Sequence, residues 1–133
     1  MEHIPTIKIK TVDAYNQRYA TVGDWLYDAE DDVLEIRVSR MNDYRSEMGV
    51  AVHELYEAVQ CLQHDVSEAQ VTAFDLKYEG ERDDGKHSDT EEAGDDIRAP
   101  YREHHIAATW VEKEITSRAG LDWAKHEQNV YDA

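Results

Sequence analysis

Three residues of one short segment, His53, Glu54 and Glu57, have types and spacing suited to chemistry. The apolar residues around them recur with helical periodicity, so we expect this segment to be a helix. Residues four apart share a helix face, and His53 and Glu57 could therefore hold one metal ion. Glu54 points to another side, from which it could act as general base on a metal-bound water. The spacing predicts a metal site, with zinc as the expected ion.

A zinc site needs a further protein ligand, and His104 is our candidate. The segment from 99 to 119 is expected to be helical. His104 lines up there with apolar residues, which are Ala108, Val111 and Ile115. Its ring should therefore point inward, where a polar group requires a partner. An alternative without metal is that His104 is a core histidine bonded to a carboxylate such as Glu57.

The neighbours of His104 could support such a site. Asp96 and Glu103 are close enough in sequence to be ligands or to orient them. His105 points away from the inward stripe, so we expect it on the surface.

The elements that must position these residues predict an α+β domain. Residues 4–40 carry strand signals, and Leu34, Ile36 and Val38 alternate strictly with polar residues. We expect a small antiparallel β-sheet of three strands, packed on three to four C-terminal helices. The expected helices are 43–63, 67–79, 99–119 and 122–131.

The helix 43–63 should form the centre of the core. Its main apolar stripe consists of Met48, Val52, Leu55, Val59 and Leu62. The opposite side carries Val50, Ala51, Ala58 and Cys61 and is less polar than a free surface, so we expect this helix to be covered on two sides. Residues 80–98 form an acidic loop without apolar periodicity, which we expect to be mobile.

Composition limits the classes of protein to consider. The 133 residues are expected to form a single domain, 1–133. The net charge of −16 argues against nonspecific nucleic-acid binding, which needs clustered Lys and Arg. One cysteine, Cys61, leaves no internal disulfide framework. Without a signal-like or membrane-spanning apolar run, we expect a cytoplasmic protein that does not bind membranes.

A second candidate site lies in the N-terminal third. Basic residues there are interleaved with aromatic ones and could line a nucleotide-sized pocket. The residues in question are Arg18, Trp25, Arg37, Arg40 and Arg45. The simpler alternative is a solvated face of the sheet.

The order of strand, short polar link and His53-Glu54 helix resembles minimal zincin-like metallopeptidases. Their motif is H-E-x-x-H, and here Glu57 replaces the second histidine. The resemblance implies a zinc-dependent hydrolase in minimal or degenerate form, with His53, Glu57 and His104 as ligands.

Four motifs also resemble a family of small, uncharacterised bacteriophage and prophage proteins. They are Gly23-Asp24-Trp25, His53-Glu54-Leu55-Tyr56-Glu57-Ala58, the segment from Gly94 to His104, and Leu121-Asp122-Trp123. This resemblance implies expression in the cytoplasm of an infected bacterial host. It leaves a second functional hypothesis, a non-enzymatic accessory or anti-defence protein. Such a protein would bind or sequester a host protein or a nucleotide signalling molecule, and it could form a homo-oligomer.

Overall fold

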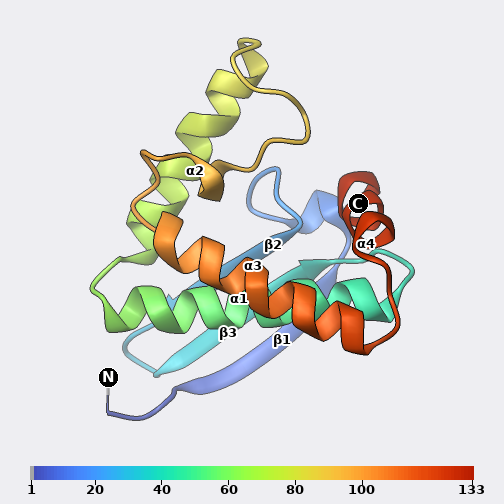
Figure 1. The fold of residues 1–133 in the computed structure, drawn as a ribbon. Helices are drawn as coiled ribbons and strands as arrows, with labels where there is room; N and C mark the ends of the chain where they lie inside the picture. Colours follow the sequence, from blue (N-terminus) through green and yellow to red (C-terminus); the bar gives the residue numbers. More distant parts are fainter. Residues whose placement is uncertain (1) are drawn as a thin grey trace.

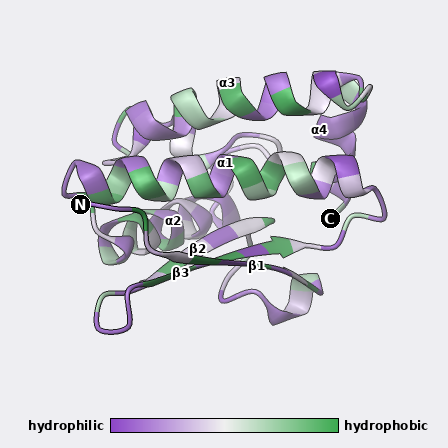
Figure 2. Ribbon diagram, turned by 90° about the horizontal axis from the view of Figure 1, so that it is seen from below, coloured by the Kyte–Doolittle hydropathy of each residue, from purple (hydrophilic) through white to green (hydrophobic). Residues whose placement is uncertain are grey.

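A sheet, helix α1 (Tyr44–Gln63) and helix α3 (Arg102–Arg118) stack as three successive layers (Figures 1 and 2). The computed structural model describes residues 2–133. Because α1 lies between the other two layers, it is covered on two sides, as its sequence predicts. Its buried residues include Val50, Ala51, Ala58 and Cys61, while Met48 of the predicted main stripe is 40% exposed.

The sheet contains strands β1 (Thr6–Val12), β2 (Gly23–Asp28) and β3 (Val33–Ser39) in the order β1-β3-β2. The alternation in β3 buries Leu34, Ile36 and Val38 completely. Strand β2 pairs antiparallel with β3, but β1 pairs parallel with β3, from Thr6 beside Val33 to Val12 beside Ser39. The α+β class is confirmed, and the prediction of a purely antiparallel sheet is wrong. The segment 13–22 crosses one end of the sheet from β1 to β2, because Val12 lies beside Ser39 and Gly23 beside Val38. Strand β2 then carries the chain back, so β1 and β3 run in one direction.

Helix α2 (Glu68–Asp83) lies beside the layers (Figure 1). Helix α4 (Trp123–Asp132) lies where α1 begins and α3 ends. The capping box of Ser67 and Gln70 starts α2, which runs four residues beyond its predicted end. Helix α3 starts at Arg102, three residues later than predicted, because the proline at position 100 disfavours helical geometry in the residue before it.

The acidic segment between α2 and α3 contains a short 3-10 turn, η2 (Ala93–Asp95). Two arginines tie the segment to α2. Arg82 donates to the carbonyl oxygen of Glu91 at 2.8 Å, and Arg98 donates to Glu81 at 2.7 and 3.0 Å. These contacts place η2 directly over the start of α3, where His104 and His105 lie.

No helix within residues 2–133 combines the length and apolar character needed to cross a membrane.

Candidate metal centre

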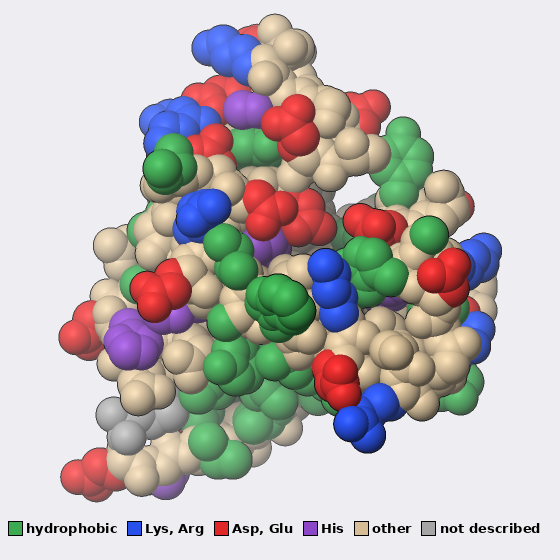
Figure 3. Space-filling model, viewed as in Figure 1, with side chains coloured by type: hydrophobic (Ala, Val, Ile, Leu, Met, Phe, Trp, Pro, Cys, Tyr) green, Lys and Arg blue, Asp and Glu red, His purple; other side chains and the backbone are tan. Residues whose placement is uncertain are grey.

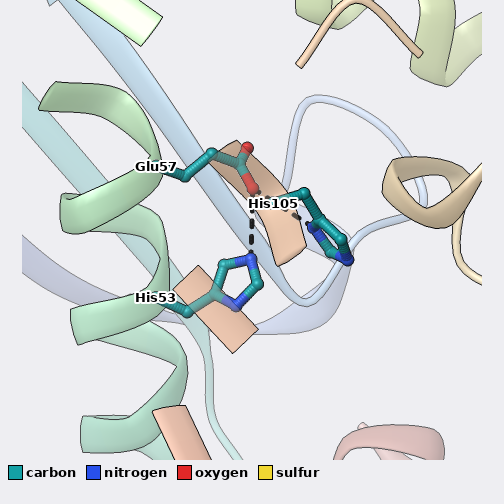
Figure 4. A group of neighbouring side chains, drawn as sticks. All are labelled: His53, Glu57 and His105. Atoms are coloured by element: carbon teal, nitrogen blue, oxygen red, sulfur yellow. Dashed lines mark hydrogen bonds and ion pairs between the residues drawn. The ribbon is translucent and has the colours of Figure 1, made fainter. Parts of the chain in front are cut away.

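His53 and Glu57 of α1 face His105 of α3 across the interface between the two helices (Figure 4). One carboxylate oxygen, Glu57 Oε2, lies 3.1 Å from His53 Nε2 and 3.2 Å from His105 Nδ1. All three residues are buried, with exposed fractions of 6%, 4% and 8%. The pairing of His53 with Glu57 follows from their spacing of four residues, because both project from the same face of α1.

The cluster has nearly the dimensions of a zinc site. Two ligands at 2.0–2.1 Å from a tetrahedral zinc lie about 3.4 Å from each other. Two sides of the cluster measure 3.1 and 3.2 Å, and one ligand atom from each of the three residues lies within 4.8 Å of the others. The third side, between the two imidazole nitrogens, lies within this limit of 4.8 Å. Two imidazoles and a carboxylate are a donor set that zinc accepts.

Each histidine of the cluster also faces a second carboxylate on its outer nitrogen. His105 Nε2 lies 3.0 Å from Glu92 Oε2. His53 Nδ1 lies 2.7 Å from Glu112 Oε1, close enough for an ion pair, although the N–H is not aligned for a good hydrogen bond. Outer carboxylates of this kind orient metal-binding histidines and fix their tautomers.

The contacts continue beyond Glu112 toward α4. Glu112 Oε2 lies 2.5 Å from Nε2 of His126, whose Nδ1 lies 2.9 Å from Ser46 Oγ on α1. Histidines and glutamates thus alternate through the helical layer in the order His105, Glu57, His53, Glu112, His126. This chain joins α1, α3 and α4 by polar contacts in the interior, where unpaired charges would be costly.

The surrounding charges shift the pKa values of the cluster strongly. Burial lowers the pKa of His53, but Glu112 and Glu57 outweigh it and raise that pKa to about 10. Burial likewise opposes the charge on His105, whose pKa is raised to about 12 by Asp95, Glu57 and Glu92. Burial favours protonation of Glu57, yet His105 and His53 lower its pKa to about 2. Without a metal, both imidazoles are therefore protonated on both nitrogens and positively charged at neutral pH.

His104, the expected third ligand, is buried but lies outside this cluster. Its ring stacks on His64 at the end of α1, with ring centroids 5.0 Å apart. The prediction that His105 lies on the surface is wrong, because His105 is the residue that reaches Glu57.

The carboxylates expected to orient the site also differ from those observed. Asp96 pairs with Arg98, and Glu103 is exposed. Their expected place is taken by Glu92 and Asp95 of the acidic segment, together with Glu112 of α3.

Glu54, the expected general base, packs toward the sheet. A Cβ added to Gly23 of β2 would lie 2.6 Å from Glu54 Oε1, so only glycine leaves room for this carboxylate. Among residues 2–133, the charged groups near Glu54 act on it through space, without a hydrogen bond. Burial and the nearby charge of Glu57 raise its pKa well above the ordinary value.

In the second candidate site, each of the four arginines is paired with a carboxylate. Arg18 forms a two-pronged pair with Asp24 at 2.7 and 2.9 Å. The other three arginines contact nearby carboxylates as well. These pairs are Arg37 with Glu35, Arg40 with Asp13, and Arg45 with Asp43. Trp25 is 2% exposed and belongs to the core.

Sequence reasoning missed His105 and Glu112 because it placed the inward face of α3 about one residue out of phase. The most buried positions of this helix are His104, His105, Ala108, Glu112 and Thr116. A usable signal was the spacing of seven residues between His105 and Glu112, which puts both on one helix face.

Comparison with protein-family models, curated proteins and solved structures found no match to this chain.

Proposed function

We propose that this protein binds a zinc-type divalent metal ion through His53 Nε2, Glu57 Oε2 and His105 Nδ1. The observation that carries the proposal is the buried convergence of these three donors from two helices, with two of the three sides only slightly shorter than the spacing of ligands on a tetrahedral zinc. Glu92 and Glu112, which face the outer nitrogens, supply the orienting contacts that such ligands use.

Hydrolysis is the reaction class that such a metal would support, with water as its fourth ligand and Glu54 as base. The raised pKa of Glu54 favours this role. Its position against Gly23 on the sheet side of α1 does not. The geometry therefore supports metal binding more directly than catalysis. In the proposed setting, inside a phage-infected bacterium, the metal would stabilise the α1–α3 pair that presents the surface of an accessory protein.

The experiment is a zinc titration of protein purified without a histidine tag, in competition with a chromophoric chelator. His53→Ala and His105→Ala should each lower the affinity more than about tenfold, because each removes a ligand. His104→Ala is the matched control, since it removes a neighbouring buried histidine that lies outside the cluster. Equal losses in the His104 and His105 variants would contradict the proposal.

The hydrolase hypothesis has its own test. Glu54→Gln should keep the zinc affinity of the wild type, because Glu54 is not a ligand. If the protein hydrolyses peptide or ester substrates, this variant should lose that activity. Full activity in Glu54→Gln would remove Glu54 as the base.

A further inference from the structure

We propose that Glu92, Asp95 and Nε2 of His105 form a second, solvent-exposed site for the same class of divalent metal ion. Glu92 Oε2 lies 3.0 Å from His105 Nε2, and Asp95 Oδ1 lies 3.5 Å from it. One donor atom from each of the three residues lies within 4.8 Å of the others. His105 belongs to both sites. The competition between them rests on the proposed function, whereas the outer site itself is argued from its own three donors.

The outer site is open to solvent on its acidic side. The side chains of Glu92 and Asp95 are 55% and 60% exposed, whereas that of His105 is only 10% exposed. A surface cavity of about 350 Å³ adjoins them, lined by Tyr78, Thr90, Glu91, Glu92, Asp95 and Asp96. The lining contains no basic residue and four carboxylates, of which Asp96 is paired with Arg98, and the excess of negative charge attracts cations. Figure 3 shows acidic side chains gathered above α3, with histidine visible beneath them.

The segment that supplies the two acids is built onto the histidine ring. A Cβ added to Gly94 would lie 2.3 Å from Cγ and 2.5 Å from Nδ1 of His105, so the backbone of η2 lies directly on that ring. Glu92 and Asp95 flank Gly94 and meet the outer edge of the ring. The buried imidazole is thus held with Nε2 directed toward the two exposed acids.

The chemistry of a single imidazole links the two sites. A neutral imidazole has one nitrogen that accepts and one that donates. When Nδ1 binds a metal, Nε2–H can donate to Glu92; when Nε2 binds a metal, Nδ1–H can donate to Glu57. In both states each ring nitrogen has a partner, but the neutral ring has only one nitrogen free to bind a metal at a time. The outer and the buried site would therefore compete for the His105 ring, and a metal at one of them leaves the other without its imidazole ligand.

The test uses zinc titrations of the full chain in which the buried site has been disabled by His53→Ala. This variant should still bind one zinc, more weakly than the wild type. Adding Glu92→Gln and Asp95→Asn should lower that remaining affinity more than about tenfold, because two of the three outer ligands are lost. Adding Asp84→Asn and Asp89→Asn is the matched control, since it removes two exposed acids of the same segment that do not line the cavity.

Unchanged zinc affinity on adding Glu92→Gln and Asp95→Asn would overturn the outer site, as would no zinc binding by folded His53→Ala. Glu57→Gln provides a second disabled background if circular dichroism shows that His53→Ala is unfolded. Two zinc ions bound at once by the wild type would overturn the competition of the two sites for the His105 ring. Wild-type affinity no higher than that of His53→Ala would instead refute the buried site of the proposed function while leaving the outer site standing.

Discussion

Glu57 is the residue on which the candidate centre depends, because one of its oxygens contacts both imidazoles. Its negative charge between two rings lets the metal-free protein keep both histidines protonated in the interior. A metal ion at the same point would replace those two protons. The metal-free and metal-bound forms therefore use the same three side chains, and protons and metal compete for them.

Zinc binding should release about two protons per ion at pH 7, one from His53 and one from His105. Ordinary histidines with a pKa near 6.5 would release only roughly a quarter of a proton each at this pH. The affinity should consequently rise about a hundredfold per pH unit between pH 6 and 8. Calorimetry in buffers of different ionisation enthalpy measures the proton count directly. Release of less than one proton per zinc would contradict this account.

At this scale the sequence predicted two of the three residues of the candidate centre. The pair His53 and Glu57 follows from spacing along one helix, which needs no tertiary information. The third member depends on the rotation of α3 about its axis, which tertiary packing determines. Two adjacent histidines, His104 and His105, made this ambiguity unavoidable, and both are buried.

The elements themselves followed largely from periodicity. Alternation predicted β3, and helical spacing predicted α1 to within one residue at its start. The parallel pairing of β1 with β3 could not be read from alternation, because side chains alternate in the same way in parallel and antiparallel strands. The contact of η2 with α3 was equally out of reach, since it depends on Arg82 and Arg98 anchoring an acidic segment that has few apolar residues and no apolar periodicity.

Gly94→Ala should disturb the centre through the backbone of η2. The added methyl would meet the His105 ring at 2.3 Å, so ring or loop must shift. We expect a loss of about 1–3 kcal/mol in unfolding free energy, as for overpacked sites, together with weaker zinc binding. Gly80→Ala on α2 is the control, because nothing lies within 4 Å of its added Cβ, and it should leave both quantities equal or higher. Chemical denaturation of both variants checks this, and similar results for the two would count against the contact.

Over the whole molecule, the chain from His105 to His126 makes stability depend on pH. The pKa of His53 is raised from 6.5 to about 10, so its contribution is complete below pH 6.5 and is lost as the pH rises through 10. The pKa of Glu57 is lowered from 4.5 to about 2, so its contribution is present above pH 4.5 and is lost as the pH falls through 2.

Metal-free protein should accordingly be most stable between about pH 4.5 and 6.5 and lose stability toward pH 9. His53→Gln should make the alkaline part of this profile shallower, because it removes one of the two imidazoles whose pKa is raised, while His105 continues to contribute. Urea unfolding at several pH values in the presence of a chelator provides the measurement. An alkaline loss that is as steep in His53→Gln as in the wild type would assign the effect to other groups.

The central claim, that His53, Glu57 and His105 hold one metal ion, is tested most directly by a crystal structure of the zinc-loaded protein with anomalous scattering recorded at the zinc edge. The account predicts a peak between α1 and α3, with His53 Nε2 and His105 Nδ1 at 2.0–2.1 Å and Glu57 oxygen at about 2.0–2.2 Å. A fully loaded crystal with zinc only at other residues, or with these three side chains still hydrogen-bonded to one another as in Figure 4, would contradict it.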